Sequence, residues 1–68
     1  MLRTEKILGA LAENGMTRKE LAIELNMAPK TFYAKMKRRQ FESNELETIV
    51  KILKIENPWE TLFGAPEV

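Results

Sequence analysis

The chain contains no cysteine, no histidine and no aspartate. Without cysteine and histidine, disulfide bonds and the usual zinc ligand sets are excluded. No apolar run approaches the ~20 residues that span a bilayer, and no signal peptide is recognisable. We therefore expect a cytoplasmic protein with no bound metal, no cofactor and no membrane association.

The same absences argue against catalysis. Ser43 has no candidate base near it in the sequence, and the ten glutamates form no pattern that indicates a paired, dry carboxylate site. We therefore expect that the protein is not an enzyme and has no small-molecule substrate.

The residues that are present can form one small core. The 68 residues are 44% hydrophobic. A single domain over residues 1–68 lies near the lower size limit for a chain that folds without a disulfide or a metal.

The basic residues are concentrated in the middle of the chain. Residues 16–41 contain seven lysines and arginines against two glutamates, a net charge of +5, and residues 28–41 contain no acidic residue. Residues 1–15 are neutral and residues 42–68 carry a net −4, which leaves +1 for the whole chain. Because attraction to phosphate depends on the charge of one face, this distribution matters more than the total.

Apolar spacing predicts five helices. They cover about residues 3–14, 17–25, 29–37, 42 or 43 to 53, and 58–63, with Thr4 and Asn57 as candidate caps for the first and the last. The positions that we expect to face the core are Ile7, Leu8, Leu11, Leu21, Ala22, Leu25, Met27, Phe32, Met36, Phe41, Leu46, Ile49, Val50 and Leu53.

Local signals define the second and third helices. Thr17 and Glu20 have the spacing of a capping box, which predicts where the second helix begins. Asn26 can adopt the positive φ of a tight turn, and Pro29 suits the first position of the next helix. Ala22 is small enough for two helix backbones to cross closely. Two short helices joined in this way are typical of a helix-turn-helix.

Residues 16–33, MTRKELAIELNMAPKTFY, resemble the helix-turn-helix of the Cro and phage-repressor family. The shared residues are Thr17, Glu20, Leu21, Ala22, Leu25 and Thr31. Residues 41–63 are similar to the C-terminal part of small prophage regulators. The resemblance implies an all-α, compact five-helix lambda-repressor-like domain with a central helix-turn-helix. It also implies a sequence-specific transcriptional regulator that binds a palindromic double-stranded DNA operator as a homodimer, with its third helix in the major groove.

The resemblance and the basic block together suggest which residues contact DNA. Base contacts are expected from Pro29, Lys30, Thr31, Tyr33 and Ala34. Phosphate contacts are expected from Thr17, Arg18, Lys35, Lys37, Arg38 and Arg39. The plainer alternatives are a solvated surface lysine for Lys30 and a half-buried tyrosine with its hydroxyl in water for Tyr33.

A second copy of the chain is also expected. With about three to five phosphate contacts, one protomer would bind DNA weakly at physiological salt. Trp59, Leu62 and Phe63 are many large apolar residues for one short helix, so we regard them as a candidate dimer interface. The alternative is that they cap the core; we favour Trp59 in the core with Leu62 and Phe63 at the interface.

The competing function is a helical protein-interaction module on the same fold, such as an antitoxin or an adaptor. A module of that kind more often carries apolar anchors on its binding helix. The acid-free basic block of residues 28–41 therefore favours DNA.

Overall fold

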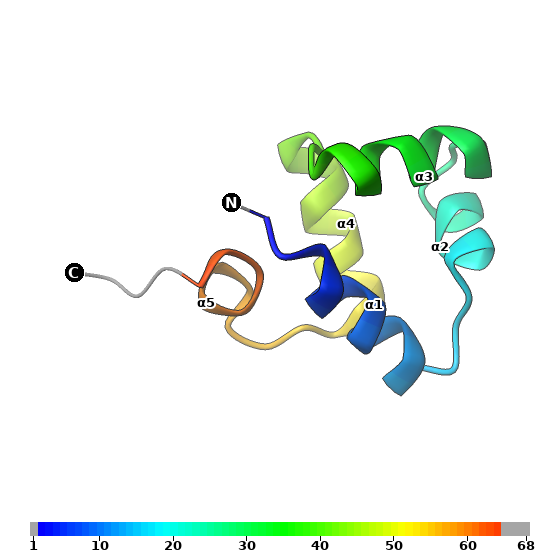
Figure 1. The fold of residues 1–68 in the computed structure, drawn as a ribbon. Coiled ribbons are helices and arrows are strands. Elements are labelled where there is room, and N and C mark those ends of the chain that lie inside the picture. Colours follow the sequence, from blue (N-terminus) through cyan, green and yellow to red (C-terminus); the bar gives the residue numbers. More distant parts are fainter. Residues whose placement is uncertain (1, 65–68) are drawn as a thin grey trace.

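The chain forms five α-helices in one compact unit (Figure 1). The computed structural model describes residues 2–64, and no strand occurs among them. The helices are α1 (Thr4–Glu13), α2 (Arg18–Glu24), α3 (Pro29–Arg38), α4 (Ser43–Leu53) and α5 (Pro58–Phe63). The prediction of an all-α domain with five helices is confirmed.

The helix ends follow from local chemistry. The predicted capping box at α2 is present: Thr17 Oγ1 accepts a hydrogen bond from the Glu20 N–H at 3.0 Å, and Glu20 Oε1 accepts one from the Thr17 N–H at 2.8 Å. Thr4 is the first residue of α1 and does not cap it, because Arg3 occupies the N-cap position and provides no side-chain cap bond. The open choice at α4 is resolved with Ser43 as the first helical residue.

The turn residues adopt the backbone angles that short connections require. Gly15 and Asn26 have φ values of 63° and 64°, and the second of these is the predicted left-handed residue between α2 and α3. Pro29 is the first residue of α3, as predicted, because its missing N–H has no helical partner at that position. Asn57 precedes α5 with φ 50° but makes no side-chain cap bond.

Each helix contributes one large, fully buried side chain to the core. These residues are Ile7, Leu21, Phe32, Ile49 and Leu62. Complete burial of such a side chain stabilises the fold by about 1.5–3 kcal/mol. Ala22 is also fully buried, where α2 packs against α3. The prediction for Leu8 was wrong: it is 41% exposed, because the buried stripe of α1 is formed by Ile7 and Leu11.

Hydrogen bonds join elements that are distant in the sequence. The Arg3 N–H donates to the Leu62 carbonyl at 2.6 Å and ties α5 to the start of α1. Asn14 Nδ2 donates to the Leu53 carbonyl at 3.1 Å and ties the end of α1 to the end of α4. These contacts hold α1, α4 and α5 together as the support for α2 and α3.

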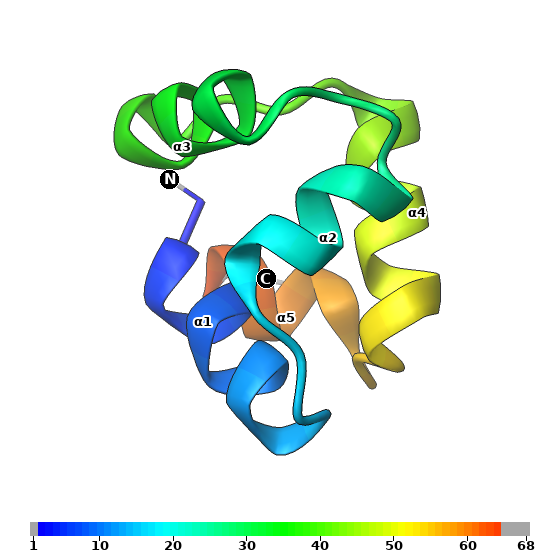
Figure 2. The same ribbon diagram turned by 90° about the vertical axis from the view of Figure 1, so that its right-hand side faces the viewer.

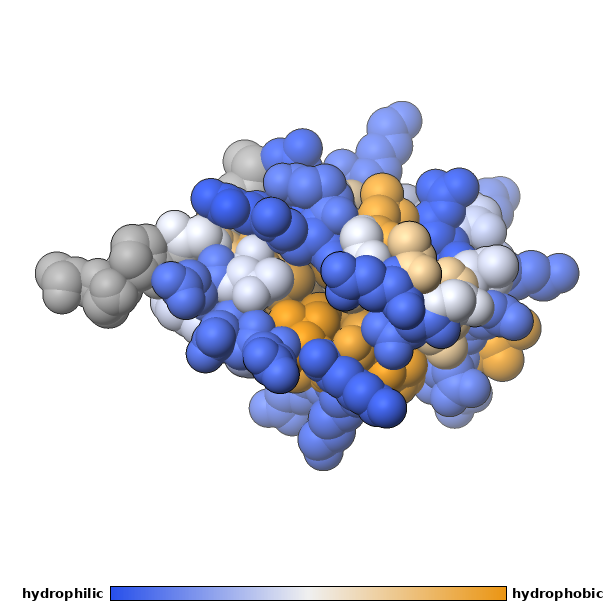
Figure 3. Space-filling view, turned by 90° about the horizontal axis from the view of Figure 1, so that it is seen from below, coloured by the Kyte–Doolittle hydropathy of each residue, from blue (hydrophilic) through white to orange (hydrophobic). Residues whose placement is uncertain are grey.

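Helices α2 and α3, with the turn between them, lie on one side of this support. In Figures 1 and 2, α3 crosses one side of the molecule, α2 lies beneath one end of it, and α5 lies at the opposite end of the molecule from α2. Figure 3 shows the side away from α3, where an apolar area is surrounded by hydrophilic side chains. None of the helices in residues 2–64 has the length and apolar character that a bilayer crossing requires.

Candidate nucleic-acid interface

Helix α3 has one buried side and one exposed, basic side. Phe32 and Met36 anchor it in the core, as predicted. Because successive residues of a helix turn by about 100°, the positions opposite these anchors form one outward face. The exposed residues of that face are Lys30, Thr31, Ala34, Lys37 and Arg38. Pro29, at the start of α3, is partly buried.

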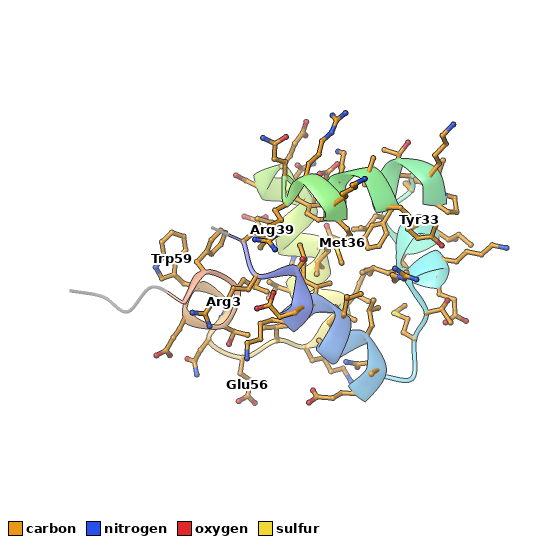
Figure 4. All side chains as sticks on the ribbon, viewed as in Figure 1. Arg3, Tyr33, Met36, Arg39, Glu56 and Trp59 are labelled. Carbon is orange, nitrogen blue, oxygen red and sulfur yellow. The ribbon has the colours of Figure 1, made fainter. Side chains whose placement is uncertain are left out.

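Tyr33 lies on the flank of α3 that faces α2. Its side chain is 43% exposed and contacts Phe32 edge-on. The Arg18 guanidinium carbon lies 5.3 Å from the centroid of the Tyr33 ring, a cation–π contact between the two helices. Figure 4 shows the Tyr33 side chain next to α2. The candidate base reader and the candidate phosphate ligand on α2 are therefore neighbours, with part of the Tyr33 ring left open to solvent.

Lys35 lies on the opposite flank, which faces α4. Its Nζ is 2.6 Å from Oε2 of Glu45, and the two side chains are only 28% and 16% exposed. Burial raises the pKa of the Glu45 carboxyl, but hydrogen bonds from Lys35 and from the Glu42 N–H outweigh that effect, so the pKa of Glu45 lies below its ordinary value. A basic residue predicted to contact phosphate is thus already paired with an acid.

The basic residues at the end of α3 point in different directions. Lys37 and Arg38 are exposed on the outward face. Arg39 follows α3 with φ 58°, a left-handed conformation, and its side chain lies between α3 and the start of α1 in Figure 4. Arg39 lines a shallow depression together with Leu2, Arg3, Glu5 and Phe63. The predicted phosphate-binding set is therefore divided over several sides of the molecule.

The hydroxyl of Thr17 has a structural role at the start of α2. Its oxygen accepts the Glu20 N–H. A hydroxyl that accepts one hydrogen bond can still donate another, so the cap is compatible with the predicted phosphate contact.

The side chains of α5 are not divided between core and interface as expected. Leu62 is 1% exposed and belongs to the core, whereas Trp59 is 64% exposed and packs at a tilt against Phe63, with the ring centroids 4.9 Å apart. The predicted placement of these two residues was wrong. The bond between the Arg3 N–H and the Leu62 carbonyl fixes the side of α5 that faces α1. Trp59 lies on another side of the helix, facing away from the core in Figure 4.

A largely apolar groove runs between α4 and α5. Its lining residues are Ser43, Leu46, Glu47, Val50, Lys51, Pro58, Trp59, Leu62 and Phe63. The sequence did not indicate this groove, because the apolar stripe of α4 was assigned entirely to the core. Leu46 and Val50 are in fact only partly buried.

The Lys35–Glu45 pair was also missed by sequence reasoning. The two residues are ten positions apart and lie on different helices, so no local spacing rule connects them.

Comparison with models of protein families, with curated proteins and with solved structures gives no match for this chain.

Proposed function

We propose that the protein is a sequence-specific transcriptional regulator that binds double-stranded DNA with α3 in the major groove. The observation that carries this proposal is the outward face of α3, where Lys30, Lys37 and Arg38 are exposed and no acidic residue occurs within the helix. The close packing of α2 on α3 supports it, because a helix-turn-helix needs its second helix held rigidly to reach base edges. A protein with this function would act in the cytoplasm.

Lys30 and Tyr33 are the main candidates for reading bases. Lys30 is in the first turn of α3, and a lysine at such a position can donate to O6 and N7 of guanine. The open part of the Tyr33 ring offers apolar contact and its hydroxyl offers a hydrogen bond. Pro29, Thr31 and Ala34 would add smaller contacts, including contact with thymine methyl groups.

The phosphate contacts would come from both sides of the reading helix. Arg18 and Thr17 lie at the start of α2, and Lys37 and Arg38 lie in the last turn of α3. Such contacts supply most of the salt-sensitive affinity and fix the register of the protein on the duplex. The Arg39 side chain is directed toward the start of α1, so Arg39 is the residue of this set least well placed to contact phosphate.

We also propose that the DNA-bound form is a homodimer that associates through the α4–α5 groove. The exposed Trp59 and its neighbour Phe63 provide apolar contact area. Glu47 and Lys51 lie one turn apart in the same groove, so a two-fold axis can bring each near its opposite charge on the second copy. Two protomers on one face of the duplex would read half-sites about 34 Å apart.

Salt-dependent binding tests the proposed function. Fluorescence anisotropy with a random-sequence duplex should give a log–log dependence of affinity on salt steeper than about −3 between roughly 50 and 200 mM. The Lys37→Ala/Arg38→Ala double variant should have a shallower slope. Lys6→Ala/Lys54→Ala is the matched control, because it removes the same charge from exposed positions outside the proposed interface.

Two results would contradict the proposal. One is an absence of binding by the wild type at the low-salt end. The other is an equal loss of slope in the double variant and its control, which would indicate a response to total charge. If the wild type does not bind DNA, the protein-interaction alternative should be tested, because the α4–α5 groove offers the apolar anchors that such a module uses.

A further inference from the structure

Glu45 holds Lys35 at the edge of the proposed interface. The flank position of Lys35 on α3 brings its ammonium to the third residue of α4, where Glu45 Oε2 accepts a hydrogen bond at 2.6 Å. Hydrogen bonds between two ionised groups are the stronger kind in proteins. The low exposure of both side chains, 28% and 16%, limits the screening of this pair by water and salt.

The carboxylate of Glu45 is fixed by a second contact. Its other oxygen, Oε1, accepts the Glu42 N–H at 2.8 Å at the start of α4. The N-terminal end of a helix also favours a negative charge. Both carboxylate oxygens therefore have donors, and the side chain does not need to move to meet Lys35.

Contact between Lys35 and a phosphate would require this arrangement to break. Glu45 would then keep a partly buried negative charge without its cation, close to a polyanion. Lys37 and Arg38 incur no such cost, because they lie on the exposed outward face of the same helix.

We infer that Glu45 neutralises Lys35 and thereby withholds one positive charge from phosphate contact. This inference rests on the proposed function. Phosphate contacts strengthen binding to every sequence, whereas base contacts discriminate between sequences. Withholding one phosphate contact therefore lowers the affinity for every sequence by a similar factor and leaves the discrimination by Lys30 and Tyr33 unchanged. In this view Lys35, which the sequence predicts to bind phosphate, makes no phosphate contact.

The salt dependence of binding tests the inference in a double-variant cycle. Glu45→Gln keeps an acceptor for the Glu42 N–H and releases Lys35, so the log–log slope on a random duplex should become steeper by about 0.9. The ratio of variant to wild-type affinity should then grow about 3.5-fold as salt is lowered from roughly 200 to 50 mM. The Lys35→Met/Glu45→Gln double variant, which removes both charges of the pair, should have the wild-type slope.

Glu56→Gln is the matched control. It removes the same charge from an exposed glutamate that lies on the side away from α3 in Figure 4. If Glu45→Gln steepens the slope no more than Glu56→Gln does, total charge is the cause and the inference is overturned. A shallower slope for the Lys35→Met/Glu45→Gln double variant would also overturn it, and this arm remains decisive if Glu45→Gln alone does not fold by circular dichroism.

The two proposals fail in different ways. Wild-type binding with a steep slope, combined with a Lys35→Met/Glu45→Gln double variant that loses part of that slope, would leave DNA binding intact and remove the role of Glu45. No binding by the wild type at about 50 mM salt would overturn the proposed function and this inference together.

Discussion

Each flank of α3 carries one side chain that contacts a charged residue of a neighbouring helix: Tyr33 on the α2 side and Lys35 on the α4 side. On the α2 side, Arg18 covers part of the Tyr33 ring and keeps its own charge near the proposed DNA surface. On the α4 side, Glu45 removes the charge of Lys35 from that surface. The exposed basic face is therefore narrower than the run of lysines and arginines in the sequence indicates.

The Lys35–Glu45 pair should also affect how stability changes with pH. The pKa of Glu45 is lower in the folded protein than its ordinary value of 4.5, so the folded state favours the charged carboxylate. The resulting stabilisation is fully present above pH 4.5 and is lost as the pH falls through the lower folded-state pKa.

Thermal unfolding between pH 7 and pH 3 can measure this effect. The midpoint of Glu45→Gln should lie below that of the wild type at pH 7, and the difference should shrink in acid. Glu56→Gln controls for the loss of one titrating carboxylate. A difference from the wild type that stays constant with pH would contradict the lowered pKa.

The stability of the short helix α2 depends on its N-terminal cap. It has seven residues, and isolated helices shorter than about 12–15 residues are marginal in water. Its stability therefore comes from its N-terminal box and from the burial of Leu21 and Ala22.

Removal of the cap acceptor should be measurable without DNA. Thr17→Ala leaves the Glu20 N–H without its side-chain partner and should cost about 1 kcal/mol of the free energy of unfolding. A loss of that size should lower the thermal midpoint by about 4–8 °C in a domain of this length. Thr17→Ser retains the hydroxyl and should stay close to the wild type. Equal destabilisation by both substitutions would indicate that the methyl group matters instead of the cap.

For the whole molecule, the proposed dimer surface has to place two reading helices on one face of the duplex. Helix α5 lies at the far end from α2 (Figure 1), and the molecule is 37 Å along its longest axis. In a two-fold dimer the separation of the reading helices is twice the distance from α3 to the axis, so an axis beside α5 must lie about 17 Å from the middle of α3 to match the half-site spacing of about 34 Å.

Sedimentation equilibrium can test the proposed association surface. Trp59→Ala should weaken self-association, and it should change monomer stability little because the side chain is 64% exposed. Ile23→Ala is the matched control, since Ile23 is 60% exposed on α2, away from the groove. A wild-type protein that remains monomeric both free and on DNA would contradict the dimer, and equal weakening by the two variants would place the contact elsewhere.

Helix positions and most of the core were already determined by the sequence. Apolar spacing identified all five helices and predicted the buried anchors Ile7, Leu21, Phe32 and Ile49. Short-range chemistry, namely the Thr17 box and the left-handed Asn26, defined the connection between α2 and α3. These features depend on residues within a few positions of one another, so the sequence contains the information directly.

The packing of the helices against one another determines which of two nearby apolar residues is buried and which charges are paired, and the sequence alone does not predict it. Leu62 and Trp59 are both large and apolar, and their exposure depends on the side of α5 that α1 covers. Lys35 meets Glu45 because of how α4 packs beneath α3, a relation between separate helices. Helical periodicity gives the direction of a side chain relative to its own helix, whereas packing between helices determines its neighbours.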